Sequence, residues 1–140
     1  MINVENDIFT IIAKALRAEF PGVFVSGEYI ISPASFPAVT LIESDNYVDR
    51  SMSTIRIEDC AVVMYSLSVF SNKASGRKQE AKKISDFADE KMRELGFTRT
   101  SRVQVPNLAD ATIYRLESRY EAVIGEGNQA GTYLVYQQTY

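Results

Sequence analysis

Carboxylates crowd one predicted helix of the chain. Asp86, Asp89 and Glu90 could together hold a metal ion, because carboxylate oxygens are ligands of hard cations. Lysines and an arginine on the same helix can offset these carboxylates, and surface ion pairs are the simpler interpretation. Asp45 and Asp49 also lie close in sequence, but they lack the further oxygen ligands of a calcium loop. We therefore predict no metal site.

Nucleophilic catalysis needs a nucleophile and a base, and the chain offers few of either. It has one cysteine, Cys60, and no histidine, which excludes Ser-His and Cys-His dyads and the commonest zinc ligand. Cys60 begins the apolar run "CAVVMYSLSVF", where a small core residue is the simpler interpretation. The sequence has no phosphate-binding glycine loop, no GxSxG and no HExxH. We expect no enzyme activity, no catalytic residue and no cofactor.

The overall charge argues against one class of partner. The chain has 15 basic and 18 acidic residues and a net charge of −3, whereas a protein that grips nucleic acid through phosphates favours a basic excess. Mixed signs on the helix over residues 75–95 favour a solvated face over a basic DNA-binding face. Tyr65, Tyr114 and Tyr120 could stack on bases, but their alternate positions on strands favour packing. A small nucleic-acid-binding protein stays open as an alternative of a different class.

The sequence also bears on the cellular compartment. No apolar stretch reaches the roughly 18 residues that a membrane span needs. The start "MINVENDIFT" is acidic and lacks the basic region of a signal peptide. A lone cysteine cannot form an internal disulfide. We expect no membrane partner and a fold that forms in a reducing cytoplasm.

The segment "PNLADATIYRLESRY", residues 106–120, has two unlike faces when read with period two. One face carries mostly apolar side chains, namely Tyr114, Leu116, Ser118 and Tyr120. The other face carries basic, acidic and basic side chains in turn, at Arg115, Glu117 and Arg119. Such a face is costly to bury unpaired and ordinary in water. One interpretation is a solvent-facing strand with cross-strand ion pairs.

Hydrophobic periodicity predicts a single α+β domain over residues 1–124. Helices are expected at residues 4–19 and 75–95. Strands are expected at residues 38–44, 59–71, 97–105 and 111–124, with a short hairpin or irregular strand pair at 23–31. Short turns favour antiparallel pairing, so we expect an antiparallel sheet of four to six strands with two helices packed on one face. One core should contain Leu67, Val69, Ile84, Met92, Leu116 and Tyr120.

Two segments depart from this pattern. Residues 45–58 are polar without a strong period, which indicates a long loop or a protruding hairpin, and such loops are often functional. Residues 125–140 form a C-terminal extension in which glycines at 125, 127 and 131 precede the apolar run from Tyr133 to Tyr136. This run either folds back as an edge strand of its own domain or adds to a partner's sheet. We favour the partner.

Four pieces of the chain carry a resemblance that covers most of the first 124 residues. They read "LRAEFPGVFVSGEYI", "FPAVTLIESDN", "YSLSVFSNKASGRKQEAKKISDFADEKMRELGFTR" and "VPNLADATIYRLESRYEAVI". In these pieces the chain resembles the tail terminator or tail-completion (head–tail joining) proteins of long-tailed bacteriophages and phage-tail-like particles. The shared features are patterns of packing and turns rather than catalytic motifs.

The resemblance implies a small α+β virion protein that forms a ring, six-fold in the tail terminators. Such a ring caps the completed tail tube, ends its growth and offers the surface that the head or its connector joins. The implied partners are further copies of the chain, the tail tube protein and the head connector or stopper protein, while DNA passes through the pore without sequence-specific binding. The implied location is the tail or neck of the virion, after assembly in the host cytoplasm. A head–tail connector or stopper at the neighbouring junction is the alternative role.

A ring makes every subunit present the same two surfaces head to tail. Alternating charges could then fix the register between neighbours, because a slip brings like charges together. The long segment and the C-terminal run could supply further contacts. The expected subunit or tail-tube interface is therefore Tyr47, Val48, Arg50, Arg115, Glu117, Arg119, Tyr133, Leu134, Val135 and Tyr136.

Overall fold

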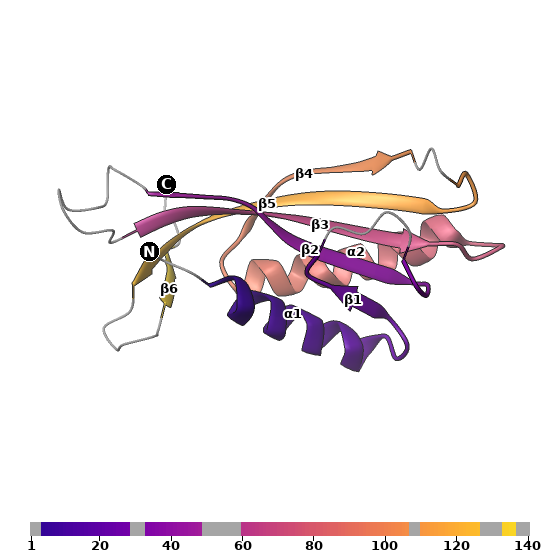
Figure 1. Ribbon diagram of the computed structural model, residues 1–140, viewed down its shortest axis with the longest axis horizontal. Coiled ribbons are helices and arrows are strands. Elements are labelled where there is room, and N and C mark those ends of the chain that lie inside the picture. The colour runs from indigo at the N-terminus through magenta and orange to yellow at the C-terminus, as the bar shows by residue number, and fades with distance from the viewer. Residues whose placement is uncertain (1–3, 29–32, 49–59, 107–109, 127–132, 137–140) are drawn as a thin grey trace.

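The computed structural model describes residues 4–28, 33–48, 60–106, 110–126 and 133–136. These residues form two helices and one sheet (Figure 1). In chain order the elements are α1 (Glu5–Glu19), β1 (Phe24–Ser26), β2 (Ala38–Val48), β3 (Cys60–Ser71), α2 (Arg77–Glu94), β4 (Thr98–Val105), β5 (Tyr114–Glu126) and β6 (Tyr133–Tyr136). The predicted α+β class is confirmed.

The sheet has the strand order β1-β2-β3-β5-β4, and β6 pairs with the end of β5. Every pair is antiparallel except β1 with β2, which are parallel with Phe24 opposite Ala38. The sheet is therefore mixed rather than wholly antiparallel. A parallel pair cannot be closed by a tight hairpin, so β1 finds its partner across a longer connection than the sequence suggested. Residues 29–31 of the predicted strand pair lie outside the described residues.

β2 is longer than predicted and takes in the start of the segment expected to be a loop or protruding hairpin. Residues 45–48 pair with β3, after a β-bulge between Glu43 and Asp45. The weak strand propensity of Asp45 and Asn46 is overridden by the long-range ladder to β3, which local sequence does not reveal. The loop alternative is thus wrong for residues 45–48, whose antiparallel pairing with β3 agrees with the hairpin alternative. Residues 49–58 lie outside the described part of the chain.

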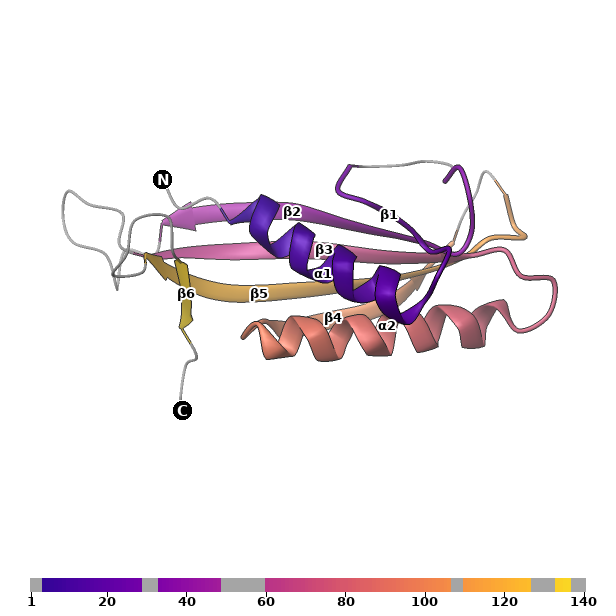
Figure 2. The same ribbon diagram turned by 90° about the horizontal axis from the view of Figure 1, so that it is seen from below.

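Both helices lie on the same face of the sheet (Figure 2). Their inward side chains recur every three or four residues, and they are Ile8, Ile12, Ala13 and Leu16 in α1 and Ala81, Ile84, Ser85, Ala88 and Met92 in α2. Gly96 follows α2 with a φ of 94°, which suits a glycine at a helix end. The cap position of α1 is Val4, which makes no side-chain cap hydrogen bond.

The core lies between the helices and this face of the sheet. All six residues predicted for it belong to one buried cluster, and none is more than 4% exposed. Inside the cluster, the rings of Tyr65 and Phe97 pack edge to face with centroids 5.4 Å apart. The predicted layer arrangement, with β3 at its centre, is confirmed.

Charged side chains fasten α2 to the neighbouring strands. Arg99 Nη1 lies 3.2 Å from Asp89 Oδ1, and Arg102 pairs with Asp86. The hydroxyl of Tyr120 donates a hydrogen bond of 3.0 Å to Asp89 Oδ1. The ion-pair interpretation is therefore confirmed for Asp86 and Asp89, although most of their partners come from β4 rather than from α2.

The described part of the predicted C-terminal extension continues the sheet. β5 runs to Glu126, past the predicted boundary at residue 124, and β6 pairs antiparallel with residues 123–126. The backbone of Tyr133–Tyr136 thus follows the edge-strand alternative that we did not favour. No helix in the described ranges is long and apolar enough to cross a membrane.

Candidate interaction surface

The sheet face opposite the helices (Figure 1), which we call the open face, carries the charged row of β5. Arg115, Glu117 and Arg119 point to this face because the residues between them fill the core. The ladder with β3 sets them opposite Phe70, Ser68 and Ser66 respectively. The row is therefore flanked by one aromatic and two small hydroxyl side chains.

Glu117 is the centre of the row. Its Oε1 accepts hydrogen bonds from Ser66 Oγ at 2.9 Å and Arg119 Nε at 3.4 Å, while its Oε2 lies 3.9 Å from Arg115 Nη2. The charges thus pair along β5 rather than across strands. The prediction of cross-strand ion pairs is wrong, because the serines that the register places opposite carry no charge.

Arg115 is held more firmly than Arg119. Its guanidinium lies 5.3 Å from the centroid of the Phe70 ring, and its Nη2 donates a hydrogen bond of 3.3 Å to Ser68 Oγ. Its Nε is buried and makes no hydrogen bond within the described residues. The side chain of Arg119, in contrast, is 68% exposed. Arg119 is therefore the cation of the row that a partner reaches most easily.

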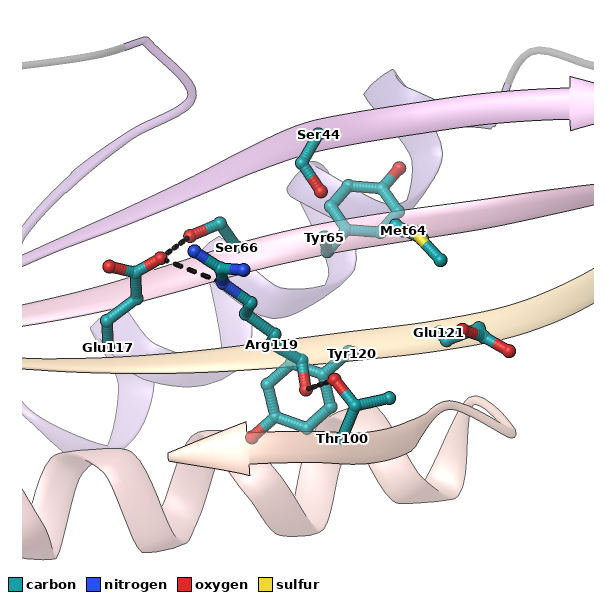
Figure 3. Close-up of a pocket in the computed structure, with 9 residues that line it drawn as sticks. All are labelled: Ser44, Met64, Tyr65, Ser66, Thr100, Glu117, Arg119, Tyr120 and Glu121. Atoms are coloured by element: carbon teal, nitrogen blue, oxygen red, sulfur yellow. Dashed lines mark hydrogen bonds and ion pairs between the residues drawn. The ribbon is translucent and has the colours of Figure 1, made fainter. Parts of the chain in front are cut away.

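A shallow depression on the open face lies beside this row (Figure 3). Side chains from four strands contribute to its lining, among them Ser44, Met64, Ser66, Thr100, Glu117, Arg119 and Glu121. Thr100 Oγ1 donates a hydrogen bond of 3.3 Å to the backbone oxygen of Arg119, which ties the bulged part of β4 to β5. The lining combines one thioether with both signs of charge. This mixed-charge lining suits contact with a mixed-charge surface.

A second polar cluster lies on the helix-covered face, where α1 begins. The pKa of Glu43 is raised above its usual value, first by burial and then by the negative charge of Glu5, and a hydrogen bond from Asn46 lowers it in part. Burial and the same two carboxylates raise the pKa of Tyr65. The Tyr65 hydroxyl is buried and has no hydrogen-bond partner in the described part of the chain. Burial and the nearby Glu5 carboxylate therefore disfavour the charged form of Glu43.

Replacing Glu43 by glutamine will raise the stability of the fold at pH 7. A carboxyl whose folded pKa is raised binds a proton more readily in the folded state, so wild-type stability falls as pH rises through that pKa. The amide removes this loss, and the gain should stay below about 1 kcal/mol because solvent screens the carboxylate. Urea unfolding at pH 7 and at about pH 4, near the ordinary pKa of glutamate, should show a gain that shrinks on acidification.

Glu90→Gln is the matched control, because Glu90 is exposed on α2 and forms no ion pair with any described residue. Its effect should be small and the same at both pH values. A Glu43→Gln variant that is less stable than the wild type at pH 7, or equally shifted at both, would refute the burial and repulsion assigned to Glu43.

The structure brings together only part of the predicted interface. Arg115, Glu117 and Arg119 form one row, and Tyr47, which is 47% exposed, shares the open face through its place opposite Val62. The backbone of Val48 pairs with Ala61, but its side chain lies outside the description, as does the whole of Arg50. The backbone of Tyr133–Tyr136 pairs with its own β5. Partner contacts at all these positions remain predictions.

Sequence reasoning missed Ser66, Ser68, Thr100 and the proximity of Glu5 to Glu43 in these surfaces. Ser66 and Ser68 were visible as polar alternate positions on β3, but their role as partners of the row depends on the register with β5. Thr100 enters through a bulge in β4. Glu5 and Glu43 are far apart in the chain, and nothing in the local sequence indicates that their side chains interact.

No family model matches the chain, and a search of curated proteins gives no significant match.

Proposed function

We propose that this chain is a virion structural protein that assembles into a closed ring of six copies. The ring caps the tail tube of a long-tailed phage or phage-tail-like particle, ends its growth and provides the surface for head joining. Its partners are further copies of itself, the tail tube protein and the head connector or stopper protein, and DNA passes through its pore. In this role the chain catalyses no reaction.

The observation that carries the proposal is the open face. A sheet covered on one side by helices leaves its other side to water or to a partner, and here that side carries a fixed row of alternating charge centred on Glu117. In a head-to-tail ring, every subunit presents the same surface to its neighbour. A row of alternating charge then makes attractive contacts in one register only, because a slip brings like charges together. The resemblance in packing and turn patterns to tail terminators supports the same role.

Two alternatives stay open. A head–tail connector or stopper would use the same kind of ring at the neighbouring junction. A nucleic-acid-binding protein, which belongs to a different class, is favoured by one observation. The cations around the start of α2, namely Lys73, Arg77, Lys78, Lys82 and Lys83, form no ion pair with any described residue.

The test is the position of the protein in the particle. Antibodies against the purified chain, coupled to gold and imaged on intact virions, should label the head-proximal end of the tail. Tails released from heads should keep the label at that end. Label confined to the capsid, or particles with no label when the chain is present in the infected cell, would reject the proposal. Label that stays with the released heads would favour the connector or stopper.

A further inference from the structure

The described cations differ in whether they pair with a carboxylate, and Lys14 and Arg17 of α1 form no ion pair with a described residue. The described cations from residue 91 onward each pair with a carboxylate: Lys91, Arg93, Arg99, Arg102, Arg115 and Arg119. None of the cations around the start of α2 forms an ion pair with a described residue. These are Lys73, Arg77, Lys78, Lys82 and Lys83, and we call them the basic patch. No described carboxylate forms an ion pair with the basic patch, although Glu19 and Glu80 line the same groove as Lys73 and Lys83.

The cations of the basic patch lie where electrostatic repulsion is unfavourable in the isolated chain. Lys78 and Lys82 are four residues apart on one side of α2, where like charges repel. Lys78 also lies in the first turn of α2, where the helix dipole disfavours cations. The acid within this stretch, Glu80, accepts a hydrogen bond of 2.7 Å from Ser71 Oγ rather than pairing with a lysine. An external anion would relieve this repulsion.

The patch is accessible and separate from the open face. Lys73, Lys78, Lys82 and Lys83 are exposed, and Lys73 and Lys83 line a groove between the end of α1 and the start of α2. Both helices cover the face of the sheet opposite the open face, and the start of α2 lies at the end of the molecule away from β6 (Figure 2). A ligand here would not compete with a partner on the row of β5.

We infer that the basic patch binds the phosphate backbone of nucleic acid without reading its sequence. Four of its five cations are lysines, which act as flexible point charges on phosphates, whereas protein interfaces are depleted in lysine and use aromatic or arginine anchors. The exposed large hydrophobic residues lie elsewhere, with Ile11 on α1, Tyr47 on β2 and Val103 on β4. The helical part of the patch spans about 9 Å at 1.5 Å per residue, enough to meet several charges of a duplex that carries one per about 1.7 Å.

The experiment measures binding of the full chain to a labelled duplex of about 30 base pairs by fluorescence anisotropy at several salt concentrations. With about three phosphate contacts, affinity should fall roughly 40-fold between about 50 and 200 mM NaCl. The double variant Lys78→Gln, Lys82→Gln should bind at least about tenfold more weakly at the lower salt and lower the salt slope by about 2. A second duplex of unrelated sequence should bind equally well.

The matched control is Lys91→Gln with Arg93→Gln. It removes the same charge from the same helix, but from cations that pair with Glu94 and Asp89 at 3.4 and 3.3 Å. This control should keep most of the affinity, and thermal melting should confirm that both double variants are folded. Equal losses in the two variants, or no binding by the wild type at low salt, would overturn the inference. Equally tight binding of poly-L-glutamate would assign the patch to an acidic protein instead.

Discussion

Replacing Leu67 by alanine will lower the free energy of unfolding by about 2–5 kcal/mol. Leu67 lies in the middle of β3, opposite Leu41 of β2 and Ser118 of β5, and it is 0% exposed. Alanine would remove buried methyl groups and leave a cavity between the sheet and the helices, because close-packed neighbours relax only in part. Urea unfolding followed by circular dichroism should show a lower midpoint at an unchanged m value.

Val103→Ala is the matched control for this loss. Val103 is also an apolar strand residue, but it is 54% exposed and lies on the open face, opposite Glu117. Its truncation should change stability by no more than about 0.5 kcal/mol. Two variants with the same unfolding midpoint would contradict the placement of Leu67 in the main core on the helix-covered face.

Reversing the charge of Arg119 to glutamate will block assembly while the subunit stays folded. Arg119 is 68% exposed and contributes one ion pair to Glu117, so its loss costs the monomer little. In a ring, the variant would present three successive acids at positions 117, 119 and 121 to each neighbour, and like charges across an interface cost several kcal/mol. Each loss of about 1.4 kcal/mol in binding free energy at a subunit contact weakens that contact about tenfold. The protein concentration needed for assembly should therefore rise by at least this factor.

Arg93→Glu controls for the change in net charge. Arg93 is 76% exposed and pairs with Asp89 at 3.3 Å, so this variant also reverses one exposed, ion-paired arginine, but on α2. Sedimentation velocity over a range of concentrations should show assembly of Arg93→Glu close to that of the wild type. If Arg119→Glu assembles equally well, the charged row is not a subunit contact.

The layer arrangement could be predicted because buried positions recur at a regular spacing along each strand and helix, and this spacing is visible in the sequence. The inward positions of β3 are apolar at every second residue, and those of α2 recur at helical spacing, so Leu67 and Ile84 could be placed in one core without the structure. The parallel pairing of β1 and the extension of β2 to Val48 could not be predicted in this way. Both depend on contacts between segments distant in sequence, and the extension of β2 passes through Asp45 and Asn46, which have weak strand propensity.

The sequence was enough to predict which residues form the charged row, but not which side chains they contact. The alternation at Arg115, Glu117 and Arg119 shows in the sequence, but the choice between pairing across strands and along β5 depends on which residue the register places opposite. The same limit applies to α2. Its sequence reads as a mixed-charge face, and only the partners of Asp86 and Asp89 reveal that its first half keeps unpaired cations.

The most direct test of the ring is the mass of the purified chain in solution, measured by light scattering. The same sample is then imaged by electron microscopy, alone and with tail tubes added. The account predicts a closed particle with a central pore and a mass of about 94 kDa, six times the 15.7 kDa of one chain. The same rings should lie on the ends of the added tubes. A chain that stays at 15.7 kDa at every concentration and forms no ring on the tubes would contradict the account.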